Sequence, residues 1–172
     1  MTQEDFARVY DAQYPRVFHY LLWRLRDANA AELLTAEVFA TALMACQKGA
    51  EPSQIGSWLV GIADHLASRR QHGAHVNERP TETDPASERD PEELALGKLD
   101  SKMIWSCMDM LSAEHRKVLL LRIVAGLSAR EVGELIGTTQ EAVRSLQLRA
   151  LLALRELSME AEVRVGRRNA AR

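Results

Sequence analysis

Apolar residues recur at helical spacing along most of the chain, which predicts an all-helical protein. Residues 4–25, residues 30–47 and residues 53–70 each place apolar side chains every three or four positions. No run alternates in the manner of a half-buried strand, and the helix-forming residues Ala, Leu, Glu and Arg dominate. Pro15 removes a backbone N–H inside the first stretch, so we expect either a kink or two abutting helices there.

The same spacing assigns the side chains that face the core of a three-helix bundle. For residues 4–25 they are Phe6, Val9, Tyr10, Tyr14, Val17, Phe18, Leu21, Leu22 and Leu25. For residues 30–47 they are Leu33, Leu34, Val38, Ala42 and Leu43. For the third helix, which Ser53 is expected to cap, they are Ile55, Trp58, Leu59, Ile62, Ala63 and Leu66.

A change of composition separates this bundle from the C-terminal half. Residues 71–90 are rich in Gly, His, Asn, Pro, Thr, Ser and acidic residues, and Pro80, Pro85 and Pro91 oppose a regular helix. We interpret this stretch as a linker between two domains. A fourth helix is expected from about Pro91 to Met108, and the basic residues 164–172 are expected to fray.

Residues 111–157 carry the start and stop signals of three helices separated by two short breaks. Ser112, Ser128 and Thr138 are the expected N-caps, and Glu131 and Glu141 follow the last two at the spacing of a capping box. The residues at 126 and 137 are glycines, which permit the turns that end a helix.

The pattern between these signals is that of a DNA-binding helix-turn-helix, in which a tight turn joins a short helix to a longer one. The short helix would bury Val132, Leu135 and Ile136, and the longer one Val143, Leu146, Ala150 and Leu154. In this motif the N-terminal residues of the second helix meet base edges in the major groove. Here those residues are Gln140, Glu141, Arg144 and Ser145.

Their chemistry suits base readout, because Arg can bind guanine and Gln can bind adenine through two hydrogen bonds, and Glu can accept from cytosine. Arg149 and Arg155 lie further along and suit phosphates. The alternative is a helical hairpin whose charged residues only form a solvated face.

Charge is distributed unevenly, although the chain of 172 residues carries only −2 overall. Residues 78–100 contain three basic and eight acidic side chains, a net charge of −5, whereas residues 101–172 contain twelve and eight, a net charge of +4. The helix-turn-helix segment is therefore basic and the middle of the chain acidic, which supports nucleic-acid binding by the former. The length and the 47% apolar content allow one core or two small ones.

Other classes of function find no support. Cys46 and Cys107 lack the spacing of a zinc or redox site and are expected to be buried fillers, and the five histidines form no metal-binding pair. There is no nucleophile–base pair or glycine-rich phosphate loop, so we expect no metal, no cofactor and no enzymatic activity. Because the N-terminus lacks a signal core and no eighteen consecutive residues are apolar, we expect a soluble, cytoplasmic protein without a membrane partner.

Two stretches of the chain resemble one known family. The string DFARVYDAQYPRVFHYLLWRLRDANAAELLTAEVFATALMA, with its Glu37-Val38-Phe39, is similar to region 2 of the sigma-70 family, and residues 58–63 resemble the segment that follows. Residues 111–157 resemble region 4 of the same family. On this pairing the chain is identified as a member of the extracytoplasmic-function (ECF, Group IV) sigma factors.

The resemblance implies an all-α fold of two small helical domains. A region 2-like three- or four-helix bundle would span residues 1–72 and a region 4-like helix-turn-helix domain residues 93–160. A flexible acidic linker at residues 73–92 would join them, and a basic tail would span residues 161–172. The linker is either a solvated tether or a segment that threads the polymerase cleft in place of nucleic acid.

The resemblance also implies partners: core RNA polymerase through its β′ clamp helices and β flap, promoter DNA, and an anti-sigma factor. Residues that would contact the polymerase are Glu32, Glu37 and Thr41. Residues that would read the −35 element are Gln140, Glu141, Arg144, Ser145 and Arg149, with phosphates held by Ser128, Arg130 and Arg155. Residues that would meet the −10 element are Lys48, Ser53, His65, Arg69 and Arg70. The Trp58 ring suits base stacking as well, but its position on the apolar stripe of the third helix favours a place in the core.

The chain departs from the family pattern at Leu33, Ala36, His65, Arg69, Leu146 and Gln147. The first two replace an acidic residue and a Gln, and His65 and Arg69 replace Asn and Asp. The last two indicate a small rotation of the buried stripe or a different phosphate contact. Two other functions therefore stay open: a sigma-like interaction module that does not melt promoters, and a stand-alone helix-turn-helix regulator.

Overall fold

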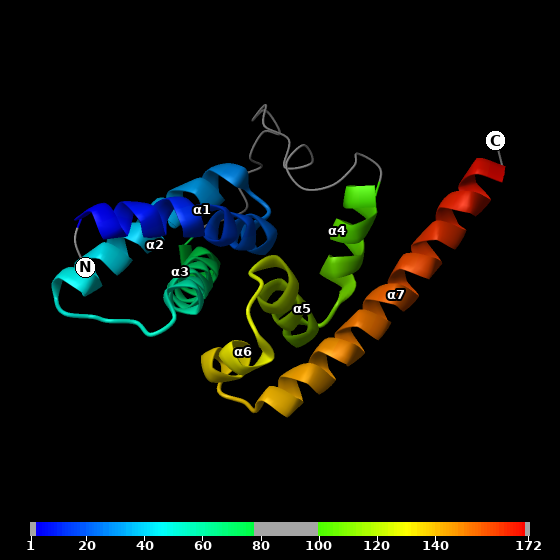
Figure 1. Ribbon diagram of the computed structural model, residues 1–172. Helices are drawn as coiled ribbons and strands as arrows, with labels where there is room; N and C mark the ends of the chain where they lie inside the picture. The colour runs from blue at the N-terminus through cyan, green and yellow to red at the C-terminus, as the bar shows by residue number, and fades with distance from the viewer. Residues whose placement is uncertain (1–2, 78–99, 171–172) are drawn as a thin grey trace. The chain divides into compact units, whose positions relative to one another are not determined.

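In the computed structural model, residues 3–77 and 100–170 are described, and all of their regular secondary structure is helical (Figure 1). The all-α prediction is therefore confirmed for these residues. The elements in chain order are α1 (Gln3–Leu25), α2 (Ala28–Gln47), α3 (Ile55–Asn77), α4 (Asp100–Met110), α5 (Ala113–Leu119), the π-helical turn η2 (Leu120–Val124), α6 (Ala129–Ile136) and α7 (Gln140–Ala170).

The described residues form two compact units, one containing α1, α2 and α3 and the other α4, α5, α6 and α7. The linker predicted at residues 73–92 begins inside a helix, because α3 continues to Asn77. The rest of that linker lies outside the described residues, and so does the predicted start of the fourth helix at Pro91. Within the described residues, α4 begins at Asp100.

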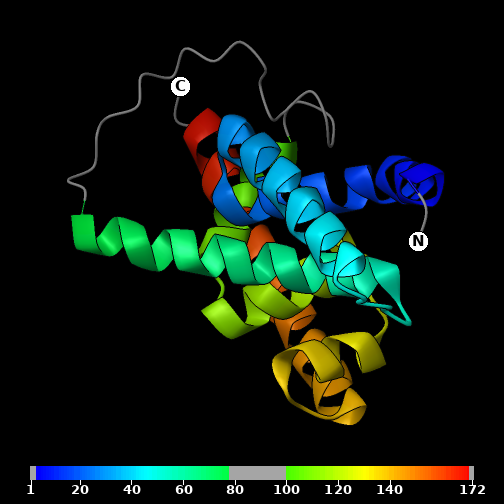
Figure 2. The ribbon, with the colours of Figure 1, turned by 90° about the vertical axis from the view of Figure 1, so that its left-hand side faces the viewer.

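The first unit is a three-helix bundle in which each helix packs on the other two (Figure 2). Val17, Leu21 and Leu22 of α1 are buried, as predicted, and so is Tyr20, which the sequence reading left out of the core. Phe39 of α2 is also buried, and its ring lies among the aromatic side chains of α1, with its centroid 4.6 Å from that of Tyr10. Burial of these large side chains accounts for the packing of α1 on α2.

Two leucines of α2 that were predicted to face the core are exposed instead. Leu33 has 66% of its surface exposed, and Leu43 is exposed as well. The face of α2 that is buried consists of Ala30, Ala31, Leu34, Thr35, Val38, Phe39 and Ala42. At about 100° per residue, Leu33 and Leu43 fall outside this arc, so their apolar character is not used by the bundle.

Helix ends in the first unit differ from the prediction. Asp27 caps α2, and its carboxylate accepts a hydrogen bond from the N–H of Ala30 at 3.0 Å. α3 begins at Ile55, so Gln54 and not Ser53 directly precedes it. α1 runs through Pro15 as a single helix, so the second of the two arrangements expected there, two abutting helices, is excluded. Packing on α2 and α3 holds the helix together although one backbone hydrogen bond is missing.

By length and composition alone, α2 could cross a membrane, since its most apolar window has a mean hydropathy of 1.2. This is weak evidence, because the core helix of a bundle passes the same test. The small and apolar residues of α2 fill the space between α1 and α3, which accounts for much of its composition.

In the second unit α4, α5 and α6 all pack on α7, the long helix that ends near the C-terminus (Figure 1). Val143, Leu146 and Ala150 are buried, as predicted. α7 stays helical to Ala170, so the expectation that residues 164–172 fray is wrong for all of those described. An ion pair between Glu160 and Arg164, one turn apart at 4.0 Å, supports this extension.

Candidate nucleic-acid interface

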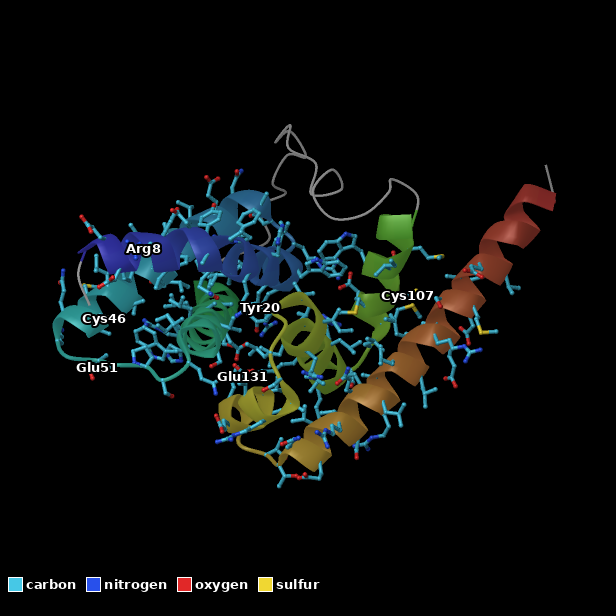
Figure 3. All side chains as sticks on the ribbon, viewed as in Figure 1. Arg8, Tyr20, Cys46, Glu51, Cys107 and Glu131 are labelled. Carbon is cyan, nitrogen blue, oxygen red and sulfur yellow. The ribbon has the colours of Figure 1, made fainter. Side chains whose placement is uncertain are left out.

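The helix-turn-helix opens with a complete capping box at α6. The hydroxyl of Ser128 accepts a hydrogen bond from the N–H of Glu131 at 3.2 Å. The Glu131 carboxylate in turn accepts from the N–H of Ser128 at 2.7 Å (Figure 3). The box predicted from the sequence is therefore confirmed, and it satisfies two backbone donors at the start of the helix. Ser112 likewise caps α5, accepting from the N–H of His115 at 3.2 Å.

The turn between α6 and α7 depends on two glycines. Gly137 ends α6 in the left-handed conformation, with φ of 73°, as the sequence predicted. Gly133, which the sequence reading did not single out, meets the turn directly, because a Cβ there would lie 2.7 Å from the carbonyl oxygen of Thr138. This close approach holds the start of α7 against α6, so a side chain at residue 133 would push the two helices apart.

α7 begins one residue later than predicted. The hydroxyl of Thr139 accepts from the N–H of Ala142 at 3.1 Å, so Thr139 and not Thr138 caps the helix. The predicted capping box of Thr138 and Glu141 is therefore wrong. The N–H of Thr138 instead donates to the carbonyl of Gly133 at 2.9 Å, which closes the turn.

The first turns of α7 separate a buried face from an exposed one. Opposite the buried stripe, Glu141, Arg144, Ser145 and Arg149 are all exposed. Successive members lie three, one and four residues apart, which keeps all four on one side of the helix. Gln140, the fifth predicted reader, is half-buried at the first position of the helix. We call the four exposed residues the α7 reading face.

The three residues predicted to contact phosphates differ in their exposure and in the partners that they already have. Arg130 is exposed and pairs with Glu134 at 2.9 Å, an exposed ion pair worth at most about 1 kcal/mol that a phosphate can displace. Arg155 is exposed on α7. At Ser128 the N–H already donates to Glu131, whose carboxylate adds negative charge beside the α6 N-terminus and so opposes a phosphate there.

The two departures in α7 are explained by packing. Leu146 is buried within a stripe that keeps its helical spacing, so no rotation of the stripe is needed. Gln147 is half-buried, and its side-chain oxygen accepts a hydrogen bond from Arg122 at 2.8 Å.

The predicted −10 residues fall into two groups on the first unit. His65 and Arg69 are exposed one turn apart on α3, with exposed Arg70 beside them. Lys48 and Ser53 are exposed in the connection between α2 and α3. Because α3 begins at Ile55, about 15 Å of helix separates its start from His65. One unstacked base therefore cannot contact both groups.

Trp58 shares a side of α3 with His65 and Arg69. It lies seven residues before His65, which is two turns of helix, and it is half-buried and not enclosed in the core. The prediction of a core position is thus only partly met. An aromatic side chain followed by an imidazole and a guanidinium forms a stripe that we call the α3 stripe.

A second exposed surface lies along α2, opposite its buried side. Its members are Glu32, Leu33, Ala36, Glu37, Ala40, Leu43 and Met44, which we call the α2 outer face. Of the predicted polymerase contacts, Glu32 and Glu37 lie within it, and Thr41 is half-buried at its edge. Leu33 and Met44 have 66% and 53% of their surface exposed, so the face combines large apolar side chains with carboxylates.

A buried polar cluster, absent from the sequence prediction, joins α1 to α3. The hydroxyl of Tyr20 donates to the Asp64 carboxylate at 2.8 Å, and the Nε of Arg24 lies 3.9 Å from the same oxygen (Figure 3). Burial, with the adjacent Asp64 carboxylate, raises the pKa of Tyr20 well above its usual value. The phenol therefore stays protonated and keeps its hydrogen bond, which fixes α3 against α1 at Asp64, about 100° around the helix from His65 of the α3 stripe.

The next observations concern the two cysteines and the residues that could hold a metal ion. Cys107 is buried, as predicted, and burial raises the pKa of its thiol, which keeps it unreactive. Cys46 is half-buried, so it is not the fully buried filler that was expected. Among the residues that the structure describes, no three His, Cys, Asp or Glu side chains gather to hold a metal ion.

A capped short helix, a glycine-dependent turn and a long helix with a polar exposed face define a DNA-binding helix-turn-helix protein. Residues 107–156 match the family model described as Sigma-70, region 4. The fold resembles that of the sigma factor RpoE from Bartonella quintana, determined in complex with the anti-sigma factor NepR, with a TM-score of 0.67 and 21% identity. This likeness covers 90% of this chain and 96% of that one, and it concerns the fold alone.

Relatives of known class cover both units. The ECF RNA polymerase sigma factor ShbA of Streptomyces griseus is 32% identical over 158 residues, which is 84% of this chain and 83% of the relative. The ECF RNA polymerase sigma factor SigX of Bacillus subtilis is 28% identical over 96% of this chain and 93% of its own. The chain therefore belongs to the ECF RNA polymerase sigma factors, as the resemblance of its two halves predicted.

Proposed function

We propose that the protein binds core RNA polymerase and directs it to promoters, with α7 reading the −35 element and α3 meeting the −10 element. The observation that carries this proposal is the α7 reading face. It presents Glu141, Arg144, Ser145 and Arg149 together on a helix that the turn at Gly133 and the capping box at Ser128 hold in place. Such side chains can form directional hydrogen bonds with base edges and charge contacts with phosphates.

The α2 outer face is the proposed docking surface for the polymerase. Apolar side chains gathered on one helix face, with carboxylates between them, suit a protein partner that offers apolar and basic groups in return. Nucleic acid fits this face poorly, because the carboxylates of Glu32 and Glu37 would repel phosphates. Leu33, where the family resemblance implies an acidic residue, would make this contact more apolar.

The α3 stripe supports the proposed role at the −10 element. Single-stranded DNA is held by aromatic platforms together with basic side chains that follow its backbone, and Trp58, His65 and Arg69 provide both on one side of a helix. Arg70 adds a further positive charge beside them. Lys48 and Ser53, at the other end of α3, would meet a different part of the strand.

The proposal implies a non-catalytic protein that works in the cytoplasm, where polymerase and promoters are found. Such a role requires no cofactor. An anti-sigma factor is a further proposed partner, since the exposed apolar residues of the α2 outer face would have to be covered in an inactive state.

Run-off transcription tests the proposal. Core RNA polymerase is incubated with a promoter-template library, with and without the full-length protein, and transcripts are sequenced. We expect transcripts from a defined subset of templates only when the protein is present. Binding to the polymerase without such transcripts would favour a sigma-like interaction module, and duplex DNA binding without polymerase binding would favour a stand-alone regulator.

A further inference from the structure

One arginine connects three parts of the helix-turn-helix unit. Arg122 lies in η2, the π-helical turn that follows α5. Its Nε donates a hydrogen bond to the side-chain oxygen of Gln147 on α7 at 2.8 Å. Its Nη1 donates to the carbonyl of Leu127, the residue before the α6 cap at Ser128. A single guanidinium therefore binds both helices of the motif, one directly and one through the residue that leads into it.

The backbone around Arg122 supports this arrangement. The N–H of Leu127 donates to the carbonyl of Leu121 at 3.0 Å, so the connection to α6 is already folded back on η2. A π-helical turn contains an extra residue per turn, which changes the direction in which Arg122 leaves the helix, and such turns are often found at functional positions.

Gln147 is well placed to control the rotation of α7. It lies three residues after Arg144 and two after Ser145, and it borders the buried stripe. The stripe itself consists of apolar side chains, whose close packing excludes a large rotation but whose contacts have no preferred direction. A hydrogen bond from the Arg122 guanidinium is directional, so it adds a constraint on a rotation of a few degrees.

The magnitude of such a rotation decides whether it matters. A turn of about 5° around the helix axis moves a side chain at a radius of about 6 Å by roughly 0.5 Å, a shift small enough for the buried stripe to keep its packing. Hydrogen bonds to base edges tolerate only a few tenths of an ångström. A rotation of that size would therefore disrupt the contacts of Arg144 and Ser145 while leaving α7 helical and buried.

We propose that Arg122 and Gln147 are positioning residues, which fix the rotation of α7 and thereby the base preference of the α7 reading face. This inference rests on the proposed function, in which α7 reads the −35 element. It concerns specificity, whereas a merely structural role would concern only stability.

The test uses the full-length protein with core RNA polymerase and promoter templates in which the upstream element is randomised. Three variants are compared with the wild type by sequencing the transcripts. Gln147→Leu removes the acceptor, Gln147→Glu keeps an acceptor at the same place, and Arg122→Lys keeps the charge but loses the planar fork that reaches two acceptors. Thermal unfolding of each variant is followed by circular dichroism.

We expect Gln147→Leu and Arg122→Lys to reduce the ratio of favoured to disfavoured bases about tenfold at the positions that α7 reads. Gln147→Glu should keep the wild-type preference. All three should retain helical content, and Gln147→Glu should keep a melting temperature close to that of the wild type.

Wild-type base preference in Gln147→Leu, with only a lowered melting temperature, would show that the pair is structural and would overturn the inference. Equal loss of preference in Gln147→Glu and Gln147→Leu would overturn it too. If the wild type itself shows no upstream preference, the proposed function fails, and that outcome is distinct from a wild-type preference that the variants leave intact.

Discussion

The α7 reading face and the α2 outer face are both exposed sides of long helices whose opposite sides are buried, yet their chemistry differs. α7 exposes Arg144, Ser145 and Arg149, side chains that form hydrogen bonds and attract phosphates. α2 exposes Leu33 and Met44 among carboxylates, a combination that favours a protein partner. The contrast favours different partners for the two faces, so substitutions on one face should leave the function of the other intact.

The largest effect is expected from Gly133→Val, which removes the support of the α7 reading face. Because even a Cβ would lie 2.7 Å from the carbonyl oxygen of Thr138, we expect a loss of about 3 kcal/mol in the free energy of unfolding of the second unit. Urea unfolding followed by circular dichroism measures it. The matched control is Gly137→Ala, where a Cβ meets nothing within 4 Å and only the positive φ costs about 1 kcal/mol. Equal losses in the two variants would contradict the role of the close approach.

Removing Arg144 should alter base readout without affecting the α2 outer face. We expect Arg144→Ala to lower discrimination at one base position by about 2 kcal/mol, because two hydrogen bonds to one base are lost. Affinity for core polymerase, measured by fluorescence anisotropy, should not change. Arg149→Ala is the control, since loss of a phosphate contact should weaken all sequences alike. A uniform loss from Arg144→Ala would refute its base-reading role.

A change in polymerase binding without a change in base readout is expected from Met44→Asp on α2. Placing a charge in the apolar part of the α2 outer face should weaken polymerase binding about tenfold, or ~1.4 kcal/mol, with base preference unchanged. Stability should change by less than about 0.5 kcal/mol, since Met44 is exposed. Ala12→Asp, at an exposed position of α1, is the matched control and should bind polymerase normally. Equal weakening in both variants would mean that added charge alone is responsible.

The smallest effect is expected from Tyr20→Phe, which acts on the support of α3. Loss of the hydrogen bond to Asp64 should cost about 1 kcal/mol near neutral pH. Because the pKa of Tyr20 is raised in the folded protein, the unfolded chain loses this proton first as the pH rises above the ordinary value of 10.0. The free energy of unfolding of the wild type should therefore fall above that pH, and that of Tyr20→Phe should fall less steeply. Urea unfolding at a series of pH values measures both. An identical pH dependence of the free energy of unfolding in the two proteins would exclude the ionisation of Tyr20 as the source of the fall.

Local features of the fold could be predicted from the sequence. The capping box of Ser128 and Glu131 and the left-handed Gly137 depend on residues within a few positions of one another, and both predictions are confirmed. The buried stripe of α7 follows from helical spacing alone, so the exposure of Arg144 opposite it could also be anticipated.

Features that join distant residues could not be predicted in this way. Tyr20 and Asp64 are 44 positions apart, and Arg122 and Gln147 are 25 apart, so only the packed fold brings them together. The exposure of Leu33 was missed for a related reason, because an apolar residue on an exposed helix face has the same sequence signal as one in the core.

The central proposal is that α7 reads the −35 element and α3 meets the −10 element. Its most direct test is transcript sequencing from a library in which both promoter elements are randomised at once, with core polymerase and the full-length protein. We predict two separate blocks of base preference, of which Arg144→Ala changes only the upstream one. A single block, or a downstream block that changes with Arg144→Ala, would contradict the assignment of the −35 element to α7 and the −10 element to α3.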